Sequence, residues 1–486
     1  MFGVLAVALA TAILTALVAL LAGYLILRGV ARRAEVGLGK NPNATLWEFL
    51  FSLKSHSLHD LALTMQRAEQ GQAAEHPLGS VPKVAWLEHI GFDPATLGRT
   101  PLNGDVPVAQ AVRLGPRAGR PLELALPVVI APMGYGVGLA DRAKIALAQA
   151  ASLAGSAVVS GEGPYLPEER GFAERWILQL SRAAWAHQQA VIDLADMVEI
   201  QWGQASEAGI GLIKNRAEMP ERAQAALAGP LVMHAAPAGH PARFIQHLRA
   251  LRPELAIGVK LPASHHLEED LNALLSWGVD VITLDGAAAG SAGSPAVISD
   301  HFGISTALAV HRAHRVLLRQ GQRQMVSLIA SGGVEGAADI AKLLALGADA
   351  VAVGSALLFA LGHEQVARHL PASPPTQLLF AHGPRQPAPE LDLDRASEHA
   401  TAWFAATRQE LATIARALGL ATLQQLNPDH LLARTAIAAE ALNLAYDAIA
   451  PDWSDVAHKV DGLVKDYGRA NRILTEIDRH LTLRGG

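Results

Sequence analysis

From about Leu126 onward, short apolar runs alternate with amphipathic stretches. Each run is rich in aliphatic or β-branched residues and ends in a turn that contains glycine or serine. The stretches between them, such as Asp141–Leu153, Pro241–Leu251, Leu267–Trp277 and Glu335–Leu346, have apolar residues at spacings of three and four, which is typical of surface helices. The eight runs are Val128–Ala131, Ala157–Ser160, Met197–Gln201, Leu231–His234, Ala256–Leu261, Val279–Leu284, Val326–Ala330 and Ala350–Val353. Eight strands alternating with helices predict an α/β fold, the (β/α)8 or TIM barrel.

A doubly wound open sheet would show a similar alternation. Such a sheet normally has a glycine-rich dinucleotide turn after its first strand. Here the first run is followed by PMGYGVG (Pro132–Gly138), which lacks the G-x-G-x-x-G spacing and its acidic partner. We therefore favour the barrel.

The beginning of the chain has a different pattern. Residues Phe2 to Leu27 contain no charge, and a helix of this length would reach about 39 Å, enough to span a bilayer. The basic residues Arg28, Arg32 and Arg33 follow this segment rather than precede it, which argues against a cleaved signal peptide. The pattern predicts a single transmembrane helix in the inner (cytoplasmic) membrane, with the body in the cytoplasm. The alternative is a buried helix of a soluble protein.

These patterns divide the chain into four parts. We expect a transmembrane anchor with its basic flank at 1–33, an N-terminal extension at 34–125, the barrel at 126–369 and a C-terminal helical extension at 370–486. The N-terminal extension has a helical stretch around Trp47–Arg67. Three helices are expected in the C-terminal extension, near Arg395–Leu418, Pro428–Tyr446 and Ser454–Leu481.

Composition excludes several functions. Half of the residues are hydrophobic and 17% are charged, so the chain has a large core. With 40 Lys and Arg against 45 Asp and Glu, the formal net charge is -5, which does not favour nucleic acid as a partner. The chain has no cysteine, and this excludes disulfides, thiolate nucleophiles and cysteine-ligated zinc or iron–sulfur clusters.

Candidate chemistry gathers where the carboxyl ends of the predicted strands meet. Glycine turns follow the last two strands, IASGGVEGAADI (Ile329–Ile340) and VGSALL (Val353–Leu358), and each leads into a helix. Backbone amides in such turns bind anions, so the pair indicates a phosphate-bearing cofactor, with ordinary tight turns as the alternative. Lys260, in GVKL at the end of the fifth strand, needs an anion or an electron-rich ring if it is buried.

With these motifs, the stretch from about Val106 to Leu361 resembles the FMN-binding synthase domain of the glutamate synthase family, in particular its short archaeal-type and stand-alone bacterial members. The matching segments are LALPVVIAPMGYGVGLADRAKIALA, SLAGSAVVSGEGPYLPEER, MVEIQWGQ, IGVKL, VDVITLDGAAAGSAGSP and VSLIASGGVEGAADIAKLLALGADAVAVGSALLFALG. The resemblance implies an FMN-dependent oxidoreductase that acts on CH-NH2 donors, with an imino or keto acid as the small-molecule substrate.

The resemblance also implies site residues. Lys260 would face the N1–O2 edge of the flavin and stabilise negative charge on the reduced ring. Glu162, in SGEG, matches the acid of the family's T-G-E-G-G loop near the substrate, although it could instead cap a helix. We therefore expect Glu162 and Lys260 to be catalytic. The implied FMN contacts are Pro132, Met133, Gly134, Ser160, Gln204, Lys260, Asp285, Ser331, Gly332, Gly333, Gly354 and Ser355.

Departures from the family pattern lie on the substrate side. The family loop Q-G-A-K-P-G is Gln204-Ala205-Ser206-Glu207-Ala208-Gly209 here, so Glu207 replaces a lysine. Ala288 stands where the family's E-G-G-T-G-A run has its acid. From this we expect that a substrate carboxylate would meet like charge at Glu207, and that the chain is a poor glutamate synthase.

Two features by which the family supplies electrons and ammonia, the cluster cysteines and the amidotransferase domain, are not found in this sequence. The positions of its three cluster cysteines are His363, His369 and Pro374 here, and we expect these to be ordinary residues rather than metal ligands. No amidotransferase domain is found, so ammonia would come from solution or from a partner, and the electron donor is unknown. Three functions stay open: an oxidoreductase with an altered substrate, a catalytically degenerate flavin-binding sensor or scaffold at the membrane, and a flavin-dependent isomerase.

Overall fold

A computed structural model of the chain describes residues 58–76, 85–227, 231–233, 239–290, 294–369, 375–383 and 390–447. The chain divides into two units, Met1–Ala74 and Glu75–Gly486. In the first unit the described element is α3 (Leu58–Gln70), which overlaps the end of the helix expected around Trp47–Arg67. All the elements below belong to the second unit.

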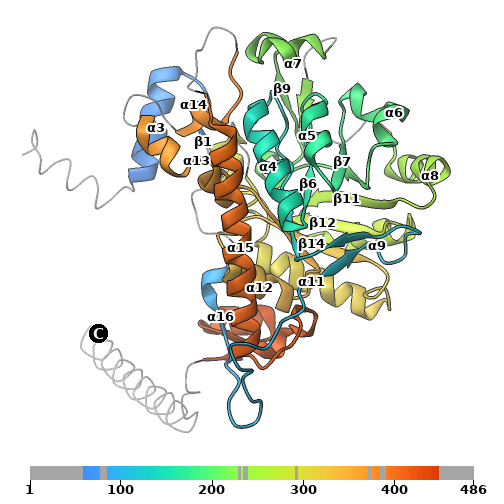
Figure 1. Ribbon diagram of the computed structural model, residues 1–486, viewed down its shortest axis with the longest axis vertical. Coiled ribbons are helices and arrows are strands. Elements are labelled where there is room, and N and C mark those ends of the chain that lie inside the picture. Colours follow the sequence, from blue (N-terminus) through green and yellow to red (C-terminus); the bar gives the residue numbers. More distant parts are fainter. Residues whose placement is uncertain are drawn as a thin grey trace, which may run out of the picture. The chain divides into compact units, whose positions relative to one another are not determined.

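Eight parallel strands close into a barrel, as predicted (Figure 1). Their order around the barrel follows the sequence, and the last strand pairs with the first to complete the ring. The strands are β5 (Val128–Ile130), β6 (Ala157–Val159), β7 (Trp176–Leu180), β8 (Met197–Gln201), β11 (Ala256–Pro262), β12 (Val281–Asp285), β14 (Ser327–Ser331) and β15 (Ala350–Val353).

One of the eight predicted barrel strands was wrong. Leu231–Met233 forms β10, which pairs antiparallel with β9 (Leu212–Lys214) in a separate two-stranded sheet. The third barrel strand is instead β7, whose five residues are all buried. The sequence did not reveal it because Ile177 is its single β-branched residue and Gln179 interrupts its apolar run. A buried glutamine is stable in a strand only if the fold supplies hydrogen-bond partners.

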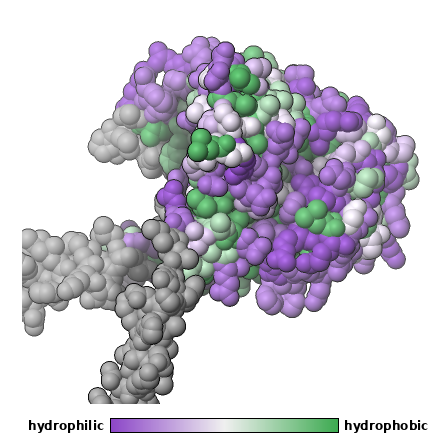
Figure 2. Space-filling view, turned by 90° about the horizontal axis from the view of Figure 1, so that it is seen from below, coloured by the Kyte–Doolittle hydropathy of each residue, from purple (hydrophilic) through white to green (hydrophobic). Residues whose placement is uncertain are grey.

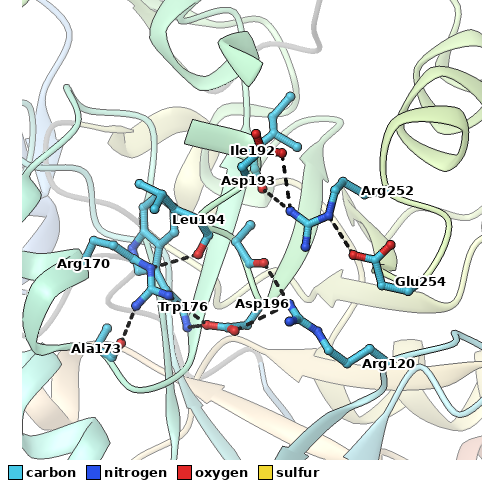
Figure 3. Close-up of polar contacts among 11 residues, drawn as sticks. Arg120, Arg170, Ala173, Trp176, Ile192, Asp193, Leu194, Asp196, Arg252 and Glu254 are labelled. Carbon is cyan, nitrogen blue, oxygen red and sulfur yellow. Dashed lines mark hydrogen bonds and ion pairs between the residues drawn. The ribbon is translucent and has the colours of Figure 1, made fainter. Parts of the chain in front are cut away.

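A network of charged side chains lies at the amino-terminal ends of β7 and β8 (Figure 3). Asp196 accepts a hydrogen bond from the backbone N–H of Trp176 at 2.9 Å, at the start of β7. The Asp196 carboxylate also lies 3.6 Å from the guanidinium groups of both Arg120 and Arg170. Arg170 donates in turn to the carbonyl of Leu194 at 2.9 Å. These contacts hold the start of β7 beside the residues that lead into β8.

The interior of the barrel is closed at one end. The antiparallel strands β3 (Val112–Leu114) and β4 (Leu122–Leu124) form a hairpin whose buried side chains join the inward-facing apolar residues of the barrel strands in one cluster. Beside the hairpin, the Gly115 N–H donates to the hydroxyl of Ser327, the first residue of β14, at 3.1 Å. The hairpin therefore covers the amino-terminal end of the barrel and leaves the carboxyl-terminal end for chemistry.

The predicted helices around the barrel are present. They are α4 (Asp141–Ala154), α8 (Pro241–Leu251), α9 (Leu267–Ser276) and α12 (Ala337–Ala345), joined by α11 (Thr306–Arg319) and α13 (Ser355–His369). Shorter helices are α5 (Pro167–Phe172), α6 (Gln189–Ile192), α7 (Glu221–Ala225), α10 (Ala296–Ser299) and α14 (Pro375–Leu379). Strand β1 (Glu75–His76) pairs with β13 (Ser294–Pro295).

The C-terminal extension is less helical than predicted. Its long helix α15 (Leu393–Ala417) is present and packs along α4, α12 and α13 (Figure 1). The single helix expected over Pro428–Tyr446 was wrong, because this stretch forms β16 (Leu431–Ala433), α16 (Ala436–Leu442) and β17 (Ala445–Tyr446). Strand β16 pairs antiparallel with β2 (Ile90–Phe92), far away in the sequence. The backbone of β2 supplies the hydrogen-bond partners of β16. The spacing of apolar residues within 428–446 does not reveal such a distant partner.

In the part of the chain that the structure describes, no helix is long and apolar enough to cross a bilayer. The expected anchor at 1–33 and the helix expected over Ser454–Leu481 lie outside the described residues. On the face shown in Figure 2, hydrophobic side chains form small patches among hydrophilic ones.

Candidate active site

The residues that the sequence assigns to a cofactor come together at the carboxyl-terminal end of the barrel. Because β7 was missed, Gln204 follows the fourth barrel strand rather than the third. The structure places Pro132, Met133 and Gly134 after β5, Ser160 and Glu162 after β6, Gln204 after β8, Lys260 in β11, Asp285 at the end of β12, Ser331 at the end of β14, Gly332 and Gly333 after it, and Gly354 and Ser355 after β15.

The loops after β5 and β6 touch backbone to backbone. A Cβ atom on Gly134 would lie 2.5 Å from the nitrogen of Gly163, and one on Gly161 would lie 2.4 Å from the nitrogen of Gly134. Gly161 also has a φ of +71°, which residues with a side chain rarely adopt. Glu162 lies between the two glycines of the second loop and is 5% exposed. This contact therefore fixes where the candidate acid sits at the barrel mouth.

Lys144 of α4 supports the same loop from behind. Its Nζ donates to the carbonyls of Val159 at 3.3 Å and Ser160 at 3.1 Å, and it lies 2.7 Å from Oε1 of Glu169 in α5. Burial raises the pKa of Glu169 to about 6, and the positive charge of Lys144 opposes this rise. The sequence did not single out Lys144, because a lysine in an amphipathic helix is expected to face solvent.

Among the described residues, three backbone N–H groups at the mouth have no hydrogen-bond acceptor. Across the described ranges, no carbonyl or side chain accepts from the N–H groups of Gly332, Gly333 or Gly354. Gly332 has a φ of +112°, and a Cβ atom there would lie 2.5 Å from the nitrogen of Ala289 in the loop after β12. Helix α13 begins directly after Gly354, and α12 begins four residues after Gly333, at Ala337. Free N–H groups ahead of two helix N-termini form a site suited to a phosphate.

Lys260 is buried inside the barrel and forms an ion pair with Asp285 of the neighbouring strand. Its Nζ is 2.8 Å from Oδ2 of Asp285, and the two side chains are 3% and 0% exposed. In the ladder between β11 and β12, Lys260 stands opposite Thr283, two residues before Asp285. The structure thus shows Asp285 as the counter-ion of Lys260, whereas the resemblance implied a direct contact with the cofactor.

A further carboxylate, which sequence reasoning missed, lies one layer deeper. Glu199 of β8 is buried and accepts hydrogen bonds from Nε2 of Gln179 at 3.0 Å and from the hydroxyl of Thr283 at 2.6 Å. Gln179 also donates to Oε1 of Gln201 at 2.9 Å. The runs WILQL and MVEIQ carry these polar residues at positions that share one face of a strand. Alternating polar residues in otherwise apolar barrel strands were the signal that could have revealed this network.

Glu207 lies in the expected loop, and its side chain is buried. The loop after β8 forms a short turn of 3-10 helix in which Glu207 is fully buried, beside Ser294 of β13. Burial raises the pKa of Glu207 to about 7, the Ser294 hydroxyl lowers it and the charge of Glu75 raises it. The neighbouring Ser206 N–H donates to the carbonyl of Ala289 at 3.2 Å. The chain thus lacks a cation at this loop position, but it does not present an exposed carboxylate there.

The two histidines at the family's cysteine positions, His363 and His369, both belong to α13. The backbone of α13 kinks at His363, whose ring centroid lies 4.4 Å from that of His399 in α15. His369 ends α13, and Pro374 lies outside the described residues. Among the residues that were placed, no group of three His, Cys, Asp or Glu side chains could hold a metal ion.

The chain is similar to glutamate synthases in sequence. Residues 107–420 match the family described as the conserved region in glutamate synthase. An archaeal-type glutamate synthase (NADPH) of Thermotoga neapolitana is 32% identical over 270 residues, which cover 54% of this chain and 52% of the relative. A glutamate synthase large subunit-like protein of Rhizobium meliloti is 29% identical over 74% of this chain and 87% of its own length. This chain spans about half the length of the archaeal-type relatives that it matches.

Similar solved structures include a mutant of an active chimera of (S)-mandelate dehydrogenase. It is 16% identical, covers 73% of this chain and 93% of its own, and has a TM-score of 0.48. A flavocytochrome b2 mutant is 15% identical, with coverages of 77% and 84% and a TM-score of 0.47. The family match extends over more than half of the sequence and includes every barrel strand. This chain therefore belongs to the glutamate synthase family.

Proposed function

We propose that this protein is an FMN-dependent oxidoreductase, glutamate synthase-like, that acts on an imino or keto acid. The observation that carries the proposal is the set of N–H groups at Gly332, Gly333 and Gly354, which have no acceptor among the described residues and lie at the same end of the barrel as the buried Lys260. A phosphate needs such donors, and a reduced flavin needs a nearby cation. The residues present therefore fit FMN.

Each part of the cofactor has candidate partners. The turns at Gly332–Gly333 and Gly354–Ser355 would bind the phosphate through backbone N–H groups. Lys260 would lie by the N1–O2 edge, while Pro132, Met133, Gly134, Ser160, Gln204 and Ser331 would line the ring and the ribityl chain. Bound FMN would supply hydride transfer, chemistry that the side chains of this protein lack.

The protein's own residues would orient the substrate and move a proton. Glu162 is held at the mouth by the glycine contact between the loops after β5 and β6, where it would face a substrate bound at the flavin. Its carboxyl group would donate a proton to the substrate as hydride arrives. Lys144 would keep this acid in place through the carbonyls of Val159 and Ser160.

Purified full-length protein in detergent tests the cofactor assignment. We expect flavin absorption bands that bleach with dithionite, without the broad absorption of an iron–sulfur cluster. A folded, colourless preparation that does not take up FMN would overturn the proposal.

Substrate turnover is tested separately. Photoreduced, anaerobic enzyme is mixed with ammonia and a panel of keto acids that includes 2-oxoglutarate, and flavin reoxidation is followed. Glu207 replaces the lysine of the family loop, so this loop has no cation to bind a second substrate carboxylate. We therefore expect 2-oxoglutarate to react slowly and a keto acid with one carboxylate to react faster. NADPH, named for the Thermotoga relative, is the first electron donor to test. If no keto acid or imino acid reoxidises the flavin, the degenerate sensor or scaffold becomes the better assignment.

We also propose that residues 1–33 anchor the protein in the inner membrane, with the barrel in the cytoplasm. The support is the uncharged segment Phe2–Leu27 followed by Arg28, Arg32 and Arg33. A truncation that starts at Ala34 should leave the membrane fraction and keep its flavin. Digestion of the barrel by protease added to intact spheroplasts would contradict the orientation.

A further inference from the structure

Three buried ionisable side chains share the barrel interior below the mouth. Lys260, Asp285 and Glu199 are all buried. If all three were ionised, one ammonium and two carboxylates would leave a net charge of -1. An uncompensated buried charge is costly, so a proton on one of the carboxylates is favoured.

Glu199 is the carboxylate better suited to hold that proton. Asp285 contacts the Lys260 ammonium directly, whereas Glu199 is bound by the neutral donors Gln179 and Thr283. Burial raises the pKa of Glu199, Lys260 and the two hydrogen bonds lower it, and Asp285 raises it further. The Thr283 hydroxyl can also rotate and accept from a protonated carboxyl, so both states of Glu199 stay hydrogen-bonded.

Register places Glu199 one layer below Lys260, on the neighbouring strand β8. Glu199 stands opposite Gly258 in β11, two residues before Lys260 and on the same face of that strand. A Cβ atom on Gly258 would lie 2.7 Å from Cε of Met197, so glycine keeps this layer open. The charged groups that face Glu199 are Lys260 from β11 and Asp285 from β12, while β7 contributes the neutral Gln179.

We propose that, at a pH where Glu199 is ionised in the oxidised protein, Glu199 takes up a proton when the flavin is reduced and thereby sets how the flavin's reduction potential depends on pH. This rests on the proposed function, because it requires FMN beside Lys260. Reduction brings two electrons from the reductant and one proton onto the ring, which then carries one negative charge. Lys260 would then face two negative groups, the reduced ring and the Asp285 carboxylate. The Glu199 carboxylate accepts a second proton, which comes from solvent. Glu199 is therefore a positioning residue that acts through Lys260.

The test compares full-length, FMN-loaded wild type with Glu199→Gln by redox titration with dithionite from about pH 5 to about pH 9. The glutamine keeps the shape of Glu199 and mimics its protonated state. We expect the two reduction potentials to coincide at low pH and to diverge as the pH rises, with the variant more positive. Thr283→Val removes a hydrogen bond that lowers the pKa of Glu199, so it should keep the pH-dependent region and move it to higher pH.

Glu123→Gln serves as the charge control. Glu123 lies on β4 at the opposite end of the barrel and its side chain is 70% exposed, so its loss should leave the potential unchanged. A constant offset between wild type and Glu199→Gln at every pH would show a structural role and would overturn the proposal. Flavin content is measured by absorbance in the same samples. Absence of bound FMN would instead refute the proposed function.

Discussion

The Nζ atom of Lys260 lies 2.8 Å from Oδ2 of Asp285, and this pair bridges β11 and β12 inside the barrel. Neither side chain reaches solvent to any useful extent. The lysine that we assign to the flavin is therefore also half of a buried ion pair. A substitution that removes one of the two charges leaves the other charge buried without its partner.

The first prediction separates these two roles. Lys260→Met should lower the free energy of unfolding by about 3–5 kcal/mol, because Asp285 stays buried without a cation. It should also lower flavin affinity and the reduction potential. The double variant Lys260→Met/Asp285→Asn should recover most of the stability but not the potential. Urea unfolding, FMN titration and redox titration measure the three quantities, and a wild-type potential in the double variant would remove Lys260 from the flavin site.

The second prediction concerns the phosphate turn. Gly332→Ala should weaken FMN binding tenfold or more, about 1.4 kcal/mol, because a Cβ atom there meets the loop after β12 and forces the turn to move. Riboflavin, which lacks the phosphate, should bind with little change. Gly336→Ala is the matched control, since a Cβ atom at Gly336 has no neighbour within 4 Å. Equal losses for FMN and riboflavin would place the phosphate elsewhere.

The third prediction is a pH dependence of stability from Glu207. The pKa of its carboxyl is about 7 in the folded protein against a reference of 4.5, so the folded state binds the proton more tightly. The resulting stabilisation is complete below about pH 4.5 and is lost as the pH rises through about 7, a change of about 3 kcal/mol. Glu207→Gln should therefore become more stable relative to wild type over that range and level off above it. Denaturant midpoints at several pH values measure this, with the exposed Glu218→Gln as control.

The fourth prediction tests the support behind the candidate acid. Lys144→Met should destabilise the protein by about 3–5 kcal/mol, because Glu169 loses its buried cation and two carbonyls lose a donor. Lys144→Met/Glu169→Leu should restore much of the stability. If Lys144 also orients Glu162, the double variant will turn over slowly although its flavin affinity is unchanged. Wild-type turnover in the double variant would show that Lys144 serves stability alone.

The sequence alone predicted the barrel architecture, seven of its eight strands and the glycine turns at its mouth. Helices such as α8 follow from a local period of apolar residues, and the turns at Gly332–Gly333 and Gly354 follow from glycines that precede a helix. These features depend on neighbours in the chain, so residue order reveals them. The family resemblance rested on the same local motifs.

Tertiary structure decided what depends on partners far apart in sequence. Leu231–Met233 and Trp176–Leu180 are both short apolar runs, and only the closed ring selects the second as a barrel strand. The environments of three carboxylates also depend on distant residues. Asp285 is the counter-ion of Lys260, Glu199 belongs to a buried hydrogen-bond network, and Glu207 is buried beside Ser294. The reason is physical, because the free energy of a strand edge or a buried charge depends on the groups that fold against it, and these come from anywhere in the chain.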